Sequence, residues 1–404
     1  MTGEGPVRRG RRAGRLALGL AVGGGLLAVA VLGLDRAFPP DLSRLHATGT
    51  EILDREGRTL SVLPAPGGIW RLPTRVEDVP PHLVELLIAA EDRRFRWHPG
   101  VDPLALARAA LQWVRAGRVV SGGSTLTMQA ARLLEPRPRT LRSKAIEILR
   151  ALQLEARFSK DDILRIWLTL APQGGNLEGI RAGALAWFGR PAAALDPAEA
   201  ALLVAIPRRP EALRPDRYPE RAMAARNALL LRRAAGAAGV TSADTQFALA
   251  VPVPDRRWPM PRLAPHLARE LARNEAGPRI ASTLDLPLQR SLEEIAASAL
   301  QGLPERASLA MIVADLRSRE VRALVGGDFG AEGRAGALDL TRAVRSPGSA
   351  LKPVLYALAF EAGIAAPDTL LTDLPRRFGG YAPENFDRGF AGRITVADAL
   401  RQSL

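Results

Sequence analysis

The chain has 404 residues, of which 47% are hydrophobic and 24% charged. This composition is typical of globular proteins and excludes a fully disordered or fibrous chain. The 56 Lys and Arg residues outweigh the 42 Asp and Glu residues, for a formal net charge of +14, and only three of the cations are lysines. There is no cysteine, and the four histidines lie far apart. Disulfides and thiolate chemistry are therefore excluded and a histidine metal cage is not expected, which leaves carboxylates, hydroxyls and lysines.

The N-terminal region has the pattern of a membrane anchor. Residues 16–34 carry no charge, and as a helix rising about 1.5 Å per residue they approach the roughly 30 Å hydrocarbon core of a bilayer. Five arginines precede them, which predicts a cytoplasmic tail over 1–15 and export of everything after the span. A cleaved signal peptide is the alternative because Ala28-Val29-Ala30 has the A-x-A form, but this tripeptide lies inside the apolar run. We therefore favour an uncleaved anchor.

The exported part divides into four segments. Residues 35–75 form a linker with a hairpin around Glu56-Gly57. Helical periodicity then predicts a mainly α domain over 76–245. A second linker over 246–306 contains a Pro- and Arg-rich stretch, and a hairpin opens an α/β domain over 307–404. The excess of arginine in this exported part favours anionic lipid headgroups or a pyrophosphate-bearing substrate as partners, and no nucleic acid is expected.

A carboxylate stands at the end of the first apolar helix of the α domain. Glu91 follows residues 81–90 and precedes Phe95 and Trp97, surroundings that can prepare a carboxylate to act as a general base. The alternative is a solvated acidic residue at a helix end. Asp102-Pro103 then has the form of an N-cap and a first-turn proline.

Two further elements carry polar groups suited to a phosphate or a sugar. Residues 121–129 form a flexible, hydroxyl-rich loop that leads into a helix, although an ordinary Ser/Thr cap would have the same pattern. Lys144 and Glu147, spaced i,i+3, share one face of the next helix. An exposed ion pair is the default interpretation. A second carboxylate beside a cation would instead suit glycosyl transfer to or from a diphosphate.

Four ordered motifs between residues 91 and 164 resemble the peptidoglycan glycosyltransferase domain of class A penicillin-binding proteins. They are E-D-R-R-F-R-W-H-P-G-V-D (91–102), G-G-S-T-L-T-M-Q (122–129), R-T-L-R-S-K-A-I-E (139–147) and S-K-D-D-I-L (159–164). The following stretches look most like the 1C subtype: T-L-A-P-Q-G-G-N-L-E-G-I-R-A (169–182), A-W-F-G (186–189) and P-A-E-A-A-L-L-V-A-I-P (197–207). The resemblance implies a lysozyme-like α fold that polymerises lipid II at the membrane surface.

The resemblance also implies roles for individual residues. Glu91 would deprotonate the acceptor sugar 4-hydroxyl for inverting attack on the lipid-linked anomeric carbon, Glu147 would be the second carboxylate, and Lys144 would lie near the donor pyrophosphate. The remaining substrate-binding candidates are Asp92, Arg93, Ser124, Thr125, Gln129 and Arg132. Met128, Arg132 and Ser143 differ from the residues usual in the family. No cofactor is required and no metal site is expected, with Mg²⁺ or Mn²⁺ left open as a helper at the pyrophosphate. Lys160 matches the family without a role that we can assign.

The α/β domain contains a serine nucleophile motif. Ser349 and Lys352 form S-x-x-K after a Pro-Gly turn, and at this spacing a lysine amine can act as the base of the serine. The stretch resembles the opening of the penicillin-binding transpeptidase domain, which also needs S-x-N and K-T-G. Ser403-Leu404 matches the first two residues of S-x-N, and none of the three lysines is followed by Thr-Gly. We therefore expect an N-terminal fragment or a truncated protein, with an incomplete transpeptidase domain.

The leading hypothesis is a peptidoglycan glycosyltransferase from a bifunctional parent. It would be anchored by a single span in the bacterial inner membrane, with its N-terminus cytoplasmic and its catalytic domains periplasmic or extracellular. Lipid II and the growing glycan would be its partners, together with other cell-wall synthesis proteins. Two alternatives stay open at this point, namely a lysozyme-like lytic enzyme and a non-catalytic scaffold for cell-wall synthesis.

Overall fold

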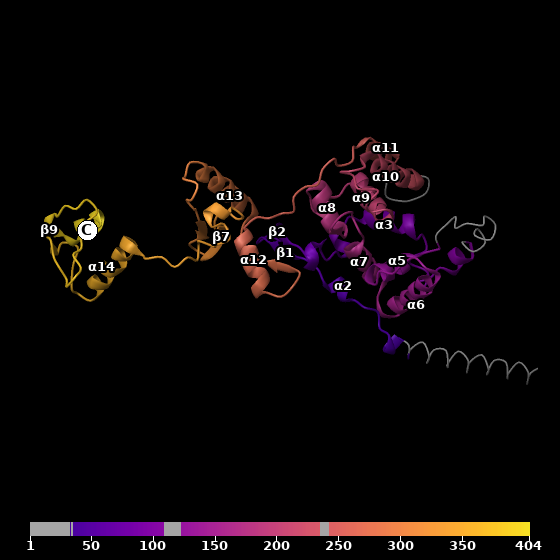
Figure 1. Ribbon diagram of the computed structural model, residues 1–404, viewed down its shortest axis with the longest axis horizontal. Helices are drawn as coiled ribbons and strands as arrows, with labels where there is room; N and C mark the ends of the chain where they lie inside the picture. Colours follow the sequence, from indigo (N-terminus) through magenta and orange to yellow (C-terminus); the bar gives the residue numbers. More distant parts are fainter. Residues whose placement is uncertain (1–32, 34, 109–122, 235–241) are drawn as a thin grey trace, which may run out of the picture. The chain divides into compact units, whose positions relative to one another are not determined.

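The computed structural model describes residues 33, 35–108, 123–234 and 242–404 (Figure 1). The chain divides between Thr341 and Arg342 into two compact units, and each is described by itself. Within the described residues, no helix combines the length and the apolar character needed to cross a membrane. The anchor predicted over 16–34 lies, except for Gly33, outside the described residues. The domain boundaries proposed from the sequence at 76, 246 and 307 stay predictions.

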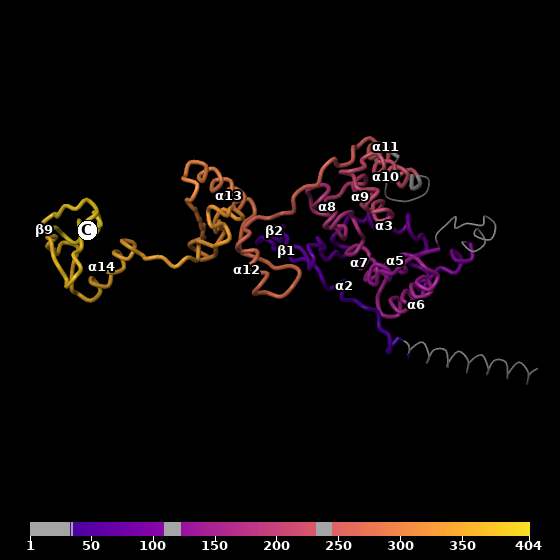
Figure 2. Tube along the Cα trace, viewed as in Figure 1, coloured from indigo at the N-terminus to yellow at the C-terminus, as the bar shows by residue number. Residues whose placement is uncertain are grey.

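A three-stranded sheet joins the two segments predicted as linkers. Strands β1 (Thr50–Leu53) and β2 (Thr59–Leu63) form the expected antiparallel hairpin. Strand β5 (Arg279–Ala281) pairs with β1 in parallel, with Ile280 opposite Ile52. Helix α12 (Pro265–Asn274) packs on β1 and β2, as the chain trace shows (Figure 2). The segments before and after the helical domain therefore share one small core.

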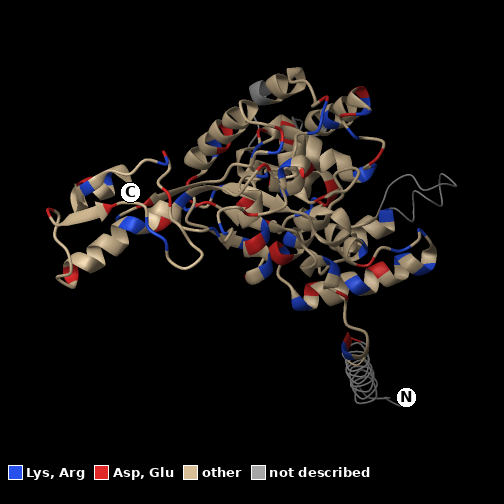
Figure 3. Cartoon of the chain, turned by 60° about the vertical axis from the view of Figure 1, so that its left-hand side comes forward, with Lys and Arg blue, Asp and Glu red and all other residues tan. Residues whose placement is uncertain are grey.

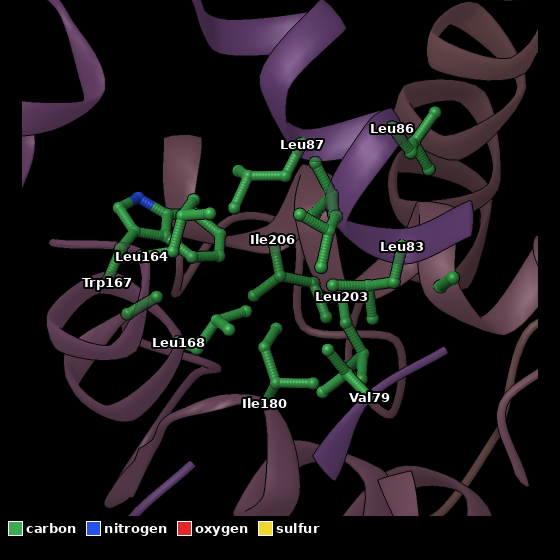
Figure 4. Close-up of a cluster of buried hydrophobic side chains, with 14 of the residues drawn as sticks. Val79, Leu83, Leu86, Leu87, Leu164, Trp167, Leu168, Ile180, Leu203 and Ile206 are labelled. Atoms are coloured by element: carbon green, nitrogen blue, oxygen red, sulfur yellow. The ribbon is translucent and has the colours of Figure 1, made fainter. Parts of the chain in front are cut away.

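The mainly α domain is built around the helix that carries Glu91 at its end. Its apolar core gathers side chains from α3, α7, α8 and the turn after α9 (Figure 4). Helix α9 packs on α3 and α10, while α5 packs on α6 and α7. The helices are α2 (Ser43–His46), α3 (Pro81–Glu91), α5 (Leu126–Leu134), α6 (Leu141–Arg157), α7 (Lys160–Leu170), α8 (Ile180–Phe188), α9 (Pro197–Ala205), α10 (Pro219–Ala234) and α11 (Ser242–Ala250).

Local sequence explains where these helices start. Thr140 accepts a hydrogen bond from the Ser143 N–H at the start of α6, and Ser159 forms a capping box with Asp162 at the start of α7. Such caps satisfy backbone donors that have no partner inside the helix. Pro81 occupies the first turn of α3, where its missing N–H costs nothing. Short elements complete the domain: strands β3 (Trp70–Arg71) and β4 (Leu177–Glu178), and the 3₁₀ helices η1 (Pro66–Gly68), η2 (Val76–Asp78), η3 (Ala192–Ala194) and η4 (Ile206–Arg208).

The C-terminal region contains two hairpins in different units. In the first unit, helix α13 (Leu286–Gln301) packs on β7 of the predicted hairpin β6 (Met311–Asp315) and β7 (Glu320–Val325), which is followed by the 3₁₀ helix η5 (Glu332–Arg334). The second unit pairs β8 with β9 in an antiparallel hairpin. Its elements are η6 (Gly348–Leu351), α14 (Lys352–Glu361), β8 (Leu370–Asp373), β9 (Gly392–Thr395) and α15 (Val396–Gln402).

The shared sheet can be tested through its central contact. Ile280 and Ile52 are both buried, so Ile280→Ala should cost about 2–5 kcal/mol of local stability. Because a chain with several domains does not unfold in one step, hydrogen exchange is the measurement. Amides of 50–63 should exchange faster, while those of α7 stay protected. The exposed neighbour Ala281 provides the control, Ala281→Ser. Unchanged protection of 50–63 would contradict the shared core.

Candidate functional site

Glu91 lies at the C-terminal end of α3, held on both sides by side chains from other helices. The Gln129 amide of α5 donates to Glu91 Oε2 at 2.9 Å, and Arg208 Nε donates to Oε1 at 2.8 Å. Trp167 Nε1 in turn donates to Gln129 Oε1 at 3.2 Å. The predicted site residues Glu91 and Gln129 are thus brought together, and the Glu91 side chain keeps 16% of its surface exposed. Arg208 was missed because no local pattern links it to a residue 117 positions earlier.

Asp92 and Thr125 form a buried framework beside Glu91. Asp92 accepts the Leu126 N–H at 3.0 Å and lies 2.9 and 3.0 Å from His98 Nε2. Thr125 donates to the Gly100 carbonyl at 2.5 Å and caps α5 by accepting the Met128 N–H. These bonds lock the hydroxyl-rich loop to the turn that follows Glu91. A direct role of Asp92 or Thr125 in binding substrate stays a prediction.

The turn after Glu91 is closely packed. Gly100 has a φ of +89°, and a Cβ at this position would lie 2.8 Å from the Ala151 carbonyl oxygen of α6, so a side chain would strain the backbone as well as clash. Lys160 Nζ donates to the His98 carbonyl at 2.6 Å and to Glu155 at 2.7 Å, and it lies 4.6 Å from the centre of the Phe95 ring. Lys160 therefore has a structural role, which sequence reasoning missed.

Asp102 holds the other end of this turn. It accepts the Ala105 N–H as the predicted N-cap and forms an ion pair with Arg94 at 2.6 Å. Burial opposes ionisation of Asp102, but the Ala105 N–H and the Arg94 guanidinium outweigh it, so the pKa of Asp102 lies below its usual value. The predicted binding residue Arg93 is exposed at this turn.

A second charged cluster joins α5, α6 and the loop before α5. Lys144 Nζ lies 3.0 Å from Glu147 Oε2 and 2.5 Å from Ser124 Oγ, while Arg132 Nη1 lies 3.9 Å from Glu147 Oε1. The predicted i,i+3 pair is formed, and the Glu147 side chain is only 10% exposed. Two cations face one carboxylate here, which leaves a local excess of positive charge. Such an excess favours an anionic ligand.

The donor set of this cluster does not suit a metal. Mg²⁺ and Mn²⁺ prefer several oxygen ligands, whereas the Glu147 carboxylate is accompanied by Lys144 and Arg132. In the part of the chain that the structure describes, no group of three or more His, Asp or Glu residues could hold a metal ion. Along the helices, the positions of cationic and acidic residues are interspersed rather than segregated by sign (Figure 3).

A cavity of about 500 Å³ lies away from both carboxylates, between α8, α9, α10 and residues 251–258. Two of its charged residues, Glu199 and Arg226, have structural partners. Glu199 accepts the Asp196 N–H at the start of α9, and burial raises its pKa. Arg226 donates to the Val251 carbonyl at 2.6 Å. None of the residues predicted for the site lines this cavity.

In the second unit, the structure joins two of the residues predicted for the transpeptidase site. Lys352 starts α14, and its amine contacts the Ser403 carbonyl and lies 3.3 Å from Ser403 Oγ. Ser349 lies one turn earlier in η6 and is exposed. The contacts of Lys352 therefore go to the first residue of the predicted S-x-N motif, and its role as the base of Ser349 stays a prediction.

Two known protein families match successive parts of the chain. Residues 57–234 match the family described as Transglycosylase, and residues 309–404 match the penicillin binding protein transpeptidase domain. The chain is 45% identical to penicillin-binding protein 1C of Escherichia coli (strain K12), over 94% of this chain and 49% of that protein. It is 33% identical to penicillin-binding protein 1B of Vibrio cholerae, over 83% of this chain and 46% of that protein. The chain thus spans about half the length of these curated relatives.

The low pKa of Asp102 predicts a pH dependence of stability. An ionised carboxylate with a lowered folded pKa contributes stability above its ordinary pKa, and this contribution is lost as the pH falls through the folded value. Asn caps a helix as well as Asp does, so Asp102→Asn removes only the charge. The hydrogen-exchange protection of amides in the turn 92–102, corrected for the intrinsic exchange rate at each pH, should differ between wild type and variant by a constant amount above about pH 5 and converge in more acidic buffer. A difference that persists in strong acid would contradict the assignment.

Proposed function

The chain belongs to the class A penicillin-binding proteins, and from this membership we propose that its helical domain polymerises lipid II into glycan strands. The observation that carries the proposal is the pair of carboxylates in different surroundings. Glu91 has one guanidinium and one neutral amide as partners, whereas Glu147 lies between Lys144 and Arg132. The first arrangement suits a base, and the second suits a site for an anionic leaving group.

In the proposed reaction, Glu91 takes the proton of the acceptor 4-hydroxyl. The oxygen of that hydroxyl attacks the anomeric carbon of the donor at the same time. The new glycosidic bond forms as the bond from that carbon to the lipid diphosphate breaks, and configuration inverts. The electron pair leaves with the diphosphate. Lys144 and Arg132 would stabilise the charge that grows there, because fixed cations stabilise developing charge without reorganising during the step. No metal is required in this scheme.

Helix α6 is attached to the residues that follow the predicted membrane span, which fits a membrane location. Arg157 forms an ion pair with Asp35 at 2.5 Å, and Arg150 donates to the Phe38 carbonyl. The helix that carries Lys144 and Glu147 is therefore fastened to the residues that directly follow the predicted span. We propose a bacterial inner-membrane protein with its catalytic domains outside, so that a lipid-linked donor reaches this helix from the bilayer. Other cell-wall synthesis proteins are proposed partners.

For the second unit, we propose Ser349 as the nucleophile of a penicillin-binding transpeptidase site, with Lys352 as its base and Ser403 as the lysine's partner. The contact between Lys352 and Ser403 supports this assignment. The sequence holds no Lys-Thr-Gly, and no transpeptidase activity is proposed for these 404 residues by themselves. The proposed activity of the chain is glycosyl transfer.

The central test replaces the proposed base. Glu91→Gln keeps the shape of the side chain and removes its charge, so lipid II polymerisation in detergent should fall at least about a hundredfold. Labelled lipid II and gel separation of the glycan products provide the measurement. Glu85→Gln is the matched control, because Glu85 is exposed on the same helix.

Three results would contradict the proposal. Shortening of preformed glycan by the wild type would indicate a lytic enzyme, and no turnover at all would indicate a scaffold. Polymerisation that survives in Glu91→Gln would remove Glu91 from the reaction.

The diphosphate site is tested at Lys144. Lys144→Ala removes the cation that lies between Ser124 and Glu147, so kcat/KM for lipid II should fall about tenfold or more. Arg142→Ala on the exposed face of α6 removes an equal charge and should have little effect. Equal losses in the two variants would indicate a general effect of surface charge instead of a local diphosphate site.

A further inference from the structure

Arg208 reaches Glu91 from a rigid position. It ends η4, two residues after Ile206, whose side chain is buried in the core beside α3. Helix α9, which precedes η4, packs along α3. The backbone of Arg208 and the last turn of α3 are therefore held by one apolar core, so the guanidinium starts from a fixed place relative to the carboxylate.

The two oxygens of Glu91 have unequal partners. Arg208 places both Nε and Nη2 at 2.8 Å from Oε1, whereas Oε2 receives the single amide donor of Gln129. A carboxylate has about four acceptor positions, two on each oxygen. Oε1 is therefore occupied by the guanidinium, and Oε2 keeps one acceptor position for another hydrogen.

We propose that Arg208 is a positioning residue that fixes the Glu91 carboxylate so that Oε2 accepts the proton of the attacking hydroxyl. This inference rests on the proposed glycosyltransferase function. The proton passes from the acceptor hydroxyl to Oε2 as the glycosidic bond forms and the bond to the diphosphate breaks. Arg208 keeps its own protons throughout, because a guanidinium does not deprotonate in proteins. It orients the base without competing for the proton.

A contribution to stability would not explain this contact. The Arg208 side chain is 40% exposed, and ion pairs near the surface contribute about 0–1 kcal/mol. Orientation of a reacting group has a larger effect on rate, because a misplacement of about 1 Å can cost about a hundredfold. The effect of Arg208 should therefore appear in kcat and hardly in the hydrogen-exchange protection of α3.

The test compares two substitutions with a neighbouring control. Arg208→Gln removes the charge and the fork of donors, while Arg208→Lys keeps the charge alone. With lipid II in detergent, kcat should fall about tenfold in Arg208→Gln with KM within about twofold of wild type, which is the pattern of a lost transition-state contribution. Arg208→Lys should recover part of the loss. The exposed neighbour Arg209 gives the control Arg209→Gln, which should behave as wild type.

Two kinetic outcomes would overturn the inference. A rise in KM with kcat unchanged would make Arg208 a contact for the substrate anion, and unchanged kinetics would make the ion pair incidental. A crystal structure of Arg208→Gln adds a readout that needs no turnover: a rotated Glu91 side chain is expected, and an unchanged one overturns the positioning role. If wild type itself does not polymerise lipid II, the proposed function fails, while the crystal structure still tests the contact.

Discussion

The apolar face of α3 is the constraint on which the site depends. Leu83 and Leu87 are completely buried, and they meet side chains of α7 and of the turn after α9 (Figure 4). Because interiors are close-packed, a helix held in this way cannot slide or rotate by a fraction of a turn without opening a cavity. The last residue of α3 is Glu91, so the core sets the position of the carboxylate. The same core holds η4, which brings Arg208 to it from the other side. Apolar packing thus fixes the backbone positions from which the two polar side chains meet.

The second carboxylate is placed by hydrogen bonds more than by packing. Thr125 ties the loop before α5 to Gly100, and Ser124 in the same loop meets Lys144 of α6. The loop therefore links the turn after Glu91 to the cluster around Glu147. A cluster with two cations for one carboxylate is suited to an anionic leaving group, whereas a carboxylate with an open acceptor position is suited to a hydroxyl. The division of roles between Glu91 and Glu147 follows from these neighbours, because the two side chains are chemically identical.

Sequence patterns predicted the local features of this fold and missed the distant ones. The hairpin β1–β2, the N-cap at Asp102 and the ion pair of Lys144 with Glu147 depend on residues a few positions apart, and all three are formed. The parallel pairing of β1 with β5 joins residues 52 and 280, so a stretch that lacked clear periodicity was interpreted as a linker. Arg208 was missed for the same reason, since its partner is fixed by the packing of α9 on α3. The spacing of apolar and polar residues along the sequence encodes helix faces and turns, but contacts across a core depend on how the elements pack.

The scarcity of lysine has a physical counterpart in the contacts that the three lysines make. Lys144 meets a hydroxyl and a carboxylate, Lys160 meets a carbonyl and a carboxylate beside an aromatic ring, and Lys352 meets the hydroxyl and the carbonyl of one serine. In each case one nitrogen serves two acceptors that converge on a point. A guanidinium has its donors fixed in a plane and spread over several atoms, and the Arg208 guanidinium brings two of its nitrogens to one oxygen of Glu91. In a chain where 53 of 56 cations are arginine, each of the three ammonium groups thus links two acceptors through one compact donor.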